Sequence, residues 1–206
     1  MADPAKIRHE QKLAGKALVR CAWVSEDPIY QAYHDTEWGV PERDDDRLFE
    51  KLLLDGAQAG LSWITILRKR DGYRAAFHGF DAERIARYTE RDIERLMADP
   101  GIVRNRQKIQ SAIGNAKAYC AMRDAGESFS GLIWSVTGGV TLQPQRTGPS
   151  DVPAVTPAST ELSRLLRARG FSFVGPTIVY AFMQAVGVVN DHIRACHRFE
   201  ACGGTR

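Results

Sequence analysis

The chain lacks the long apolar runs that membrane-spanning proteins need. Of its 206 residues, 44% are hydrophobic and 26% are charged. No run is long enough to cross a bilayer. The first twenty residues carry charges throughout, whereas a signal peptide has an apolar centre. The composition is ordinary for a soluble globular domain, and we therefore expect a cytoplasmic protein with no membrane partner.

Cysteine and excess charge are also scarce. The four cysteines are too scattered for a disulfide scaffold, and Cys120 and Cys202 suggest no role by their positions. The net charge is only +3, which permits an anionic partner without demanding one. Composition alone therefore excludes a disulfide-rich domain but selects no substrate.

Alternating strand patterns are absent, and helical periodicity takes their place. Asp44–Asp46 can cap a helix, "TERD" at 89–92 matches a capping box, and residues 104–122 predict a long helix. Residues 137–158 are rich in Gly, Pro, Thr and Ser and predict a loop. The sequence predicts an all-α fold with a flexible extension (1–20), one folded unit of two helical lobes (21–198) and a flexible tail (199–206).

The stretch "VNDHIRACH" contains a pair of residues with metal-ligand spacing. On a helix, His192 and Cys196 would share one face. Cys21 and His34, near the other end of the chain, would complete a set of two cysteines and two histidines, which zinc binds tetrahedrally. Four protein ligands leave no open position, so such a zinc ion would be structural and would tie the two ends together. The alternative is a set of ordinary buried side chains.

A second group combines aromatic residues with one acidic residue. Asp55 follows "KLLL" and falls near the buried side of its helix. A buried carboxylate is costly without a cation or hydrogen-bond donors, and a binding site can use that need; a helix cap or an arginine partner is the alternative. Aromatic residues of this kind more often form a core or an interface. They are Trp23, Tyr30, Tyr33, Trp38 and Trp63.

Two basic stretches flank turns, "RKR" at 68–70 and "RNRQK" at 104–108. Basic groups and backbone N–H groups at a helix start can bind phosphate. The segment "DPGIV" between two predicted helices suggests a hairpin, although the usual pair of glycines flanking an apolar residue is absent. Charge runs are more often solvated faces, so this signal alone is weak.

Four long motifs together resemble the 3-methyladenine DNA glycosylase I family. They are "CAWVSEDPIYQAYHDTEWGVPE", "GLSWITIL", "FVGPTIVYAFMQAVGVVNDH" and the terminal H-x-x-x-C, and the resemblance covers about residues 21–197. It implies a helix-hairpin-helix glycosylase with a zinc snap joining the N- and C-terminal regions. The zinc ligands that it implies are Cys21, His34, His192 and Cys196, the set that the spacing also indicates.

The resemblance also implies a site for a flipped base. The five aromatic residues named above match the family's base pocket, while Gly60 and Leu61 match the tip that enters the DNA stack. The base-reading acid of the family is typically glutamate, and the matching residue here is Asp55, which is shorter by one methylene or roughly 1.5 Å of reach. This departure puts the rate and the selectivity in question, though not the fold.

The function that the resemblance implies is a monomeric, monofunctional DNA glycosylase. It would excise 3-methyladenine from alkylated double-stranded DNA by base flipping and hydrolysis of the N-glycosidic bond, in base excision repair. No lysine is obviously placed to form a Schiff base, so we expect no lyase activity. Two alternatives stay open: a non-catalytic protein that binds alkylated DNA, and an unrelated zinc-stabilised interaction domain.

Overall fold

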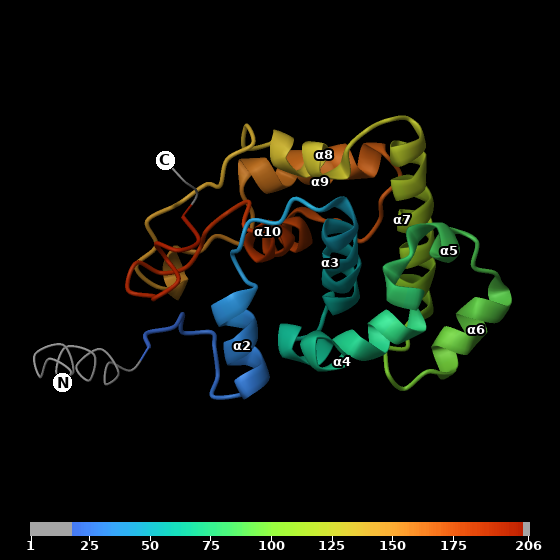
Figure 1. Cartoon of the computed structure of the whole chain (residues 1–206), viewed down its shortest axis with the longest axis horizontal. Helices are drawn as coiled ribbons and strands as arrows, with labels where there is room; N and C mark the ends of the chain where they lie inside the picture. Colours follow the sequence, from blue (N-terminus) through green and yellow to red (C-terminus); the bar gives the residue numbers. More distant parts are fainter. Residues whose placement is uncertain (1–17, 204–206) are drawn as a thin grey trace, which may run out of the picture.

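The computed structural model describes residues 18–203, and in that part all regular elements are helical (Figure 1). The all-α prediction is confirmed; the only β feature among the described residues is an isolated bridge between Leu142 and Val189. None of the described helices could cross a membrane. The helices are α2 (Pro28–Thr36), α3 (Asp45–Gln58), α4 (Trp63–Ala76), η1 (His78–Phe80), α5 (Ala82–Ala86), α6 (Glu90–Ala98), α7 (Arg106–Asp124), α8 (Phe129–Ser135), η2 (Pro149–Asp151), α9 (Pro157–Ala168) and α10 (Pro176–Ala185).

Helix starts follow the capping residues of the sequence. The Asp44 side chain accepts from the backbone N–H of Arg47 at the start of α3. At the start of α6, the backbone N–H of Thr89 donates to the Asp92 carboxylate, which forms the expected capping box. Each such bond satisfies a backbone group that the first helical turn leaves unpaired. The predicted starts of both helices are confirmed.

Two helices were not expected from the sequence. In α2, the Asp27 side chain caps the helix and Pro28 occupies the first turn. In α8, the Ser128 hydroxyl accepts from Gly131 N–H. Both carry recognisable start signals, but they are short, and helices of this length depend on tertiary packing for their stability. The predicted loop at 137–158 is largely irregular and contains η2.

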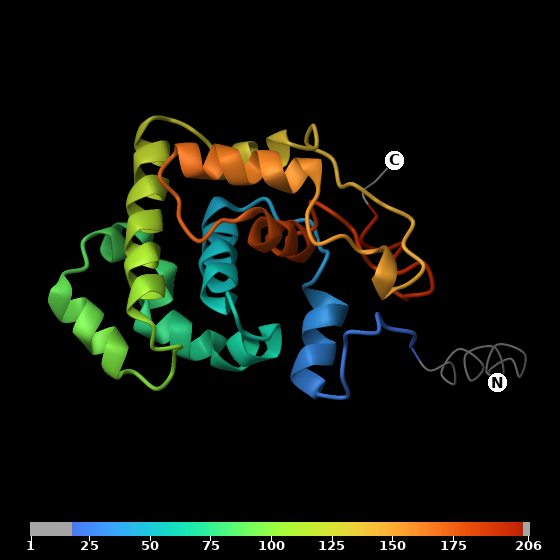
Figure 2. The same cartoon turned by 180° about the vertical axis from the view of Figure 1, so that it is seen from behind.

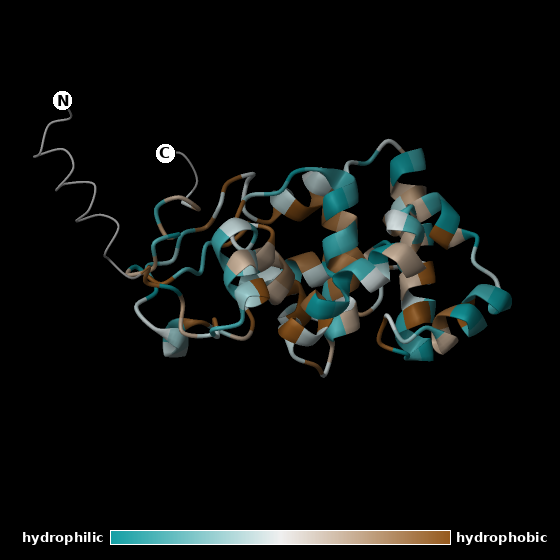
Figure 3. Cartoon of the chain, turned by 60° about the horizontal axis from the view of Figure 1, so that its bottom comes forward, coloured by the Kyte–Doolittle hydropathy of each residue, from teal (hydrophilic) through white to brown (hydrophobic). Residues whose placement is uncertain are grey.

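Helix α3 is central and packs against α4, α7, α8 and α10 (Figures 1 and 2). Its apolar side, including Leu48, Phe49 and Leu52, is buried in the main hydrophobic core. The helices carry both apolar and polar residues (Figure 3). A second, smaller cluster lies beside this core, and it positions the candidate site. Its buried members are Cys21, Tyr33, Trp38, Leu67, Ala185 and Cys196.

The two ends of the described chain meet. The backbone N–H of His197 donates to the carbonyl oxygen of Val19 over 3.0 Å. The predicted extension (1–20) lies mostly outside the described residues, which begin at 18 and end at 203, whereas the predicted tail (199–206) is described as far as residue 203. Phe199 and Cys202, placed in that tail by the sequence, are buried, at 5% and 1% exposure. The predicted boundaries of extension and tail stay predictions.

Candidate metal centre and base pocket

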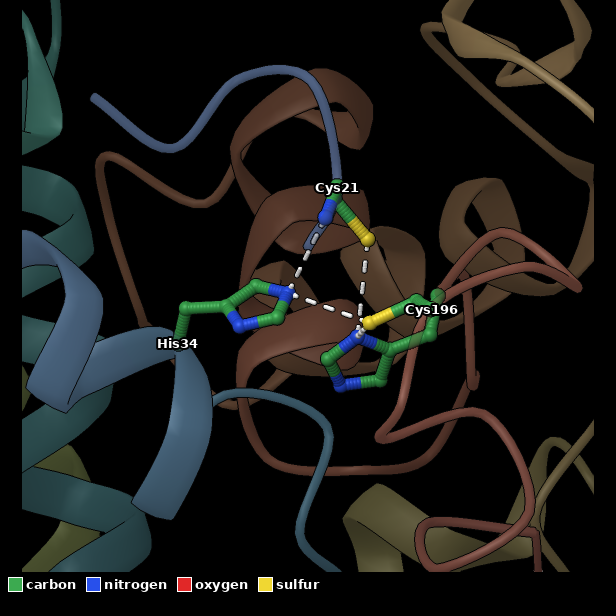
Figure 4. Close-up of side chains that lie close together, drawn as sticks. Cys21, His34 and Cys196 are labelled. Carbon is green, nitrogen blue, oxygen red and sulfur yellow. Dashed lines mark hydrogen bonds between the residues drawn. The ribbon is translucent and has the colours of Figure 1, made fainter. Parts of the chain in front are cut away.

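The four predicted metal ligands come together from distant parts of the chain. Cys21 precedes α2, His34 belongs to α2, and His192 and Cys196 follow α10. All four are buried, and their ligand atoms lie within 4.8 Å of one another (Figure 4). The segment that contains His192 and Cys196 is not helical and forms turns, so the two residues do not meet by sharing a helix face. Turns nevertheless bring Cys196 Sγ to 3.4 Å from His192 Nδ1.

The spacing of these atoms fits a tetrahedral metal ion. Bonds of about 2.3 Å to sulfur and about 2.0–2.1 Å to nitrogen at a tetrahedral angle place S and N about 3.6 Å apart. Cys21 Sγ lies 3.5 Å from His192 Nδ1, and Cys196 Sγ lies 3.5 Å from His34 Nε2. The pKa of Cys196 is lowered, first by hydrogen bonding from the Cys21 thiol and then by the two histidines. The group can hold a metal ion.

Outer hydrogen bonds fix the orientation of both histidines. His34 Nδ1 lies 2.8 Å from the Asp35 carboxylate, and His192 Nε2 donates to the carbonyl oxygen of Trp38 over 3.0 Å. The ring nitrogens that remain face the cysteines, which is the arrangement metal-binding histidines need. Arg20 binds Asp35 through two nitrogens and lowers the pKa of that carboxyl to about 2, with further help from His34. Asp35 is therefore an anionic support for the cluster.

A cavity of about 390 Å³ adjoins the metal cluster. A volume of this size suits a small-molecule or base site. All five predicted aromatic residues form close ring pairs. The ring centre of Trp23 lies 5.0 Å from those of both Tyr30 and Trp38, and that of Tyr33 lies 5.3 Å from that of Trp63. The cavity wall is partly exposed to solvent at Trp23, whose exposed fraction is 37%. All five line the cavity: Trp23, Tyr30, Tyr33, Trp38 and Trp63.

Two buried carboxylates line the same cavity, but only one has a free oxygen. Asp191 is fully engaged, since it accepts from Arg146 Nε over 2.9 Å and from the Tyr180 hydroxyl over 2.5 Å. Asp55 is 3% exposed, and its Oδ2 has no hydrogen-bond partner among residues 18–203. Burial raises the pKa of Asp55, and the nearby Lys51 opposes that rise. Asp55 is thus the carboxylate at this cavity that has an unpaired oxygen.

Lys51 is a cavity residue that the sequence reasoning missed. Its ammonium group donates to Asp55 Oδ1 and lies 4.0 Å from the centre of the Trp63 ring. Burial lowers the pKa of Lys51, and Asp55 opposes that effect. The signal was present in the sequence, because residues four apart on a helix are neighbours. What the sequence did not reveal is that both side chains point into a cavity.

The predicted tip lies between α3 and α4. Gly60 is exposed with a φ of +77°, a conformation that favours glycine, and Leu61 is 41% exposed. From α7, Lys108 Nζ donates to the carbonyl oxygens of Ala57 and Ala59, over 2.8 and 2.6 Å, and holds the base of this turn. An exposed leucine on a supported turn is a suitable wedge.

Most of the basic residues predicted to bind phosphate have partners within the protein. In the first stretch, Arg68 pairs with Asp27 and Arg70 with Glu37. In the second, Arg106 binds two glutamates of α6, and Lys108 supports the tip. These basic side chains therefore form contacts within the protein. In the part of the chain that the structure describes, few basic side chains of the turn between α6 and α7 are left without a partner.

Comparisons with known proteins agree with this geometry. A family model described as methyladenine glycosylase matches residues 23–199. The chain belongs to the methyladenine glycosylase family. It is 55% identical over 179 residues to DNA-3-methyladenine glycosylase 1 of Escherichia coli, covering 87% of this chain and 96% of that protein. It is 49% identical over 177 residues to DNA-3-methyladenine glycosylase of Haemophilus influenzae, covering 86% and 96%.

Solved structures of the family have the same fold. A crystal structure of 3-methyladenine DNA glycosylase I superposes with a TM-score of 0.86 at 55% identity, covering 87% of this chain and 98% of that one. A structure from Staphylococcus aureus, concerned with 3-methyladenine recognition, gives a TM-score of 0.85 at 38% identity, covering 89% and 98%. The family and fold expected from the sequence motifs are confirmed.

Proposed function

We propose that this chain is a monofunctional DNA-3-methyladenine glycosylase I, which hydrolyses the N-glycosidic bond of 3-methyladenine in alkylated double-stranded DNA as a step of base excision repair. The observation that carries the proposal is the aromatic cavity with one buried carboxylate oxygen left free, Asp55 Oδ2, in a chain of this family. The relatives named above bear the name of this activity. A cytoplasmic monomer without a membrane partner remains our expectation.

The cavity suits the chemistry of a methylated adenine. The base is positively charged while it is attached to the sugar and leaves as a neutral molecule, so its departure needs no general acid. Ring faces such as those of Tyr33 and Trp63 favour a cation by about 0.5–2 kcal/mol per good contact. The free oxygen of Asp55 can accept a hydrogen bond from the base edge and complement its charge. We assign Asp55 as the catalytic, base-reading acid.

The turn at Gly60 and Leu61 serves base extrusion in this proposal. Swinging a nucleotide out of the duplex costs a few kcal/mol, and less when a lesion already weakens its pairing. Leu61, exposed on its supported turn, would fill the space that the base leaves in the stack. The cavity begins beside this turn, since Trp63 is the first residue of α4.

We propose zinc as the ion that Cys21, His34, His192 and Cys196 hold. Two thiolates and two imidazoles form a donor set that zinc prefers, and four protein ligands leave no position for substrate. When bound, the ion supplies a crosslink and no hydrolytic water. Through Trp38, which accepts from His192 and lines the cavity, the cluster also supports the wall of the base pocket.

Release of free base from methylated duplex DNA tests this function. We expect purified protein to liberate 3-methyladenine, detected by chromatography, and to form no borohydride-trapped adduct with the abasic product. DNA binding without release would favour the non-catalytic alternative. Absence of both, in folded and metal-loaded protein, would contradict the proposed activity, although the chain would still belong to the methyladenine glycosylase family.

A further inference from the structure

We propose that the Lys51 ammonium is an internal cation that occupies the place of the positively charged base and that an incoming base must displace. Lys51 is thereby a positioning residue that sets how strongly the cavity prefers a charged ligand over a neutral one. The identity of the displacing base rests on the proposed function. The competition itself rests on the geometry of the cavity.

The ammonium already holds both kinds of partner that a cationic base would use. It donates to Asp55 Oδ1 and lies 4.0 Å from the centre of the Trp63 ring. The two charged side chains are 15% and 3% exposed, so water screens their attraction only weakly. A planar cation stacked on Trp63 and bound to Asp55 would meet the ammonium at close range. Two like charges in a buried site repel strongly.

A neighbouring cavity gives the displaced side chain somewhere to go. This second cavity has a volume of about 410 Å³, and Lys51, Tyr33 and Trp63 line both spaces. The carboxylates of Glu37 and Glu50 line the second cavity. They pair there with Arg70 and Arg74. A flexible lysine that leaves Asp55 could therefore approach these carboxylates, which it would share with the two arginines.

The arrangement explains how the empty pocket tolerates a buried carboxylate. A lone charge removed from water is costly, whereas a paired one is tolerated. When a positively charged base binds, it replaces the Lys51 ammonium beside Asp55. The binding free energy gained from the charge of the base is therefore reduced by the loss of the Lys51–Asp55 pair. A cavity without this lysine would hold a charged ligand more tightly relative to a neutral one.

Binding of a matched pair of probes tests the exchange without DNA or catalysis. N-methylquinolinium is a permanently charged bicyclic ring of about the size of a purine, and quinoline is its neutral counterpart. Quenching of tryptophan fluorescence gives both dissociation constants. We expect Lys51→Gln, which keeps a neutral donor for Asp55, to raise the ratio of cation to neutral affinity at least tenfold. Lys51→Arg, which keeps the charge, should leave the ratio within about threefold of the wild type.

A control and a second measurement complete the test. Lys117→Gln removes one exposed positive charge from α7 and should leave the ratio unchanged. In the wild-type protein, the ¹⁵Nζ signal of Lys51 should shift on addition of N-methylquinolinium and much less on addition of quinoline. An unchanged ratio in Lys51→Gln together with an unmoved Lys51 signal would overturn the proposal. Failure of the wild type to release 3-methyladenine would overturn the proposed function alone, because the probe experiment needs no release.

Discussion

At the scale of single residues, the unpaired oxygen of Asp55 is the feature on which the proposed recognition depends. Its other oxygen accepts from Lys51, which holds the side chain in place, whereas Oδ2 is buried and has no hydrogen-bond partner among residues 18–203. The resemblance to the family implies a glutamate at this position, which would reach about 1.5 Å further. If Asp55 reads the base as proposed, the same hydrogen bonds need a shifted helix, a bridging water, or a base seated deeper in the cavity.

Replacement of this carboxylate should be costly. A hydrogen bond to a charged group contributes about 1.5–3 kcal/mol, so we expect Asp55→Asn to lower kcat/KM for 3-methyladenine release by about 10- to 150-fold. Steady-state release assays measure the change. Asp71→Asn is the matched control, since that side chain is 96% exposed. Equal activities of the two variants would contradict the assignment of Asp55.

The dependence of kcat/KM on pH should also report on Asp55. Burial raises the pKa of Asp55 above 3.8, so on lowering the pH it takes up a proton earlier than an exposed aspartate does. A protonated Asp55 no longer complements a cation. We therefore expect kcat/KM to fall as the pH drops through this raised pKa, and we expect the acidic limb to be missing in Asp55→Asn. A pH–rate profile that is the same in both proteins would assign the limb to another group.

At the scale of elements, α7 supports the end of α3. Lys108 donates to two carbonyl groups, those of Ala57 and Ala59, that the end of a helix leaves unpaired. We expect Lys108→Met to lower the free energy of unfolding by about 1–3 kcal/mol, since two hydrogen bonds from a charged donor are lost. Urea denaturation measures the change. Lys117→Met, on the same helix but exposed, should change it by less than about 0.5 kcal/mol.

The turn at Gly60 and Leu61, which Lys108 supports, should affect activity on duplex DNA but not the binding of a free base. Burial of a leucine side chain is favourable by about 1.5–3 kcal/mol, so loss of the wedge in Leu61→Ala should lower kcat/KM on methylated duplex by about tenfold or more. Binding of free 3-methyladenine should be unaffected, as measured by calorimetry. Leu142→Ala removes an equally exposed leucine (40% against 41%) outside the turn, and its activity should stay at the wild-type level.

Element starts were largely predictable because their causes are local. Asp44, Asp81 and the Thr89–Asp92 box cap their helices within a few residues. The site was predictable only in part. Spacing pointed to the four metal ligands, and position along the motif pointed to the aromatic residues. Lys51 and Asp191 could not be assigned to the cavity, because nothing local shows which side chains of α3 and the C-terminal segment face the same space.

At the scale of the whole molecule, the four candidate metal ligands bring segments near the two ends of the described chain together. Cys21 and His34 come from the N-terminal segment, His192 and Cys196 from the C-terminal segment. A metal ion that binds only the folded state stabilises it by about 4 kcal/mol when its free concentration is a thousand times the Kd. We therefore expect a strong chelator to lower Tm by several degrees or more, as measured by calorimetry.

Cysteine variants distinguish the loss of a bound metal ion from other causes of a lower Tm. Cys21→Ser should lower Tm in the same direction, and the chelator should then add little, because both remove the same crosslink. Cys120→Ser, in α7 and away from the cluster, should keep the response to chelator. A protein that carries no metal by elemental analysis and has a chelator-independent Tm would exclude the metal centre.

The meeting of the two chain ends has a practical consequence for engineering. Because the N–H of His197 binds the carbonyl of Val19, a short peptide could join the backbone near residue 19 to that near residue 199. New ends could then be opened at Gly138–Gly139, in an exposed turn after α8, without cutting a helix. Such a circularly permuted chain would keep its candidate metal ligands and cavity together. Its new ends would lie at the start of the long loop, residues 137–158.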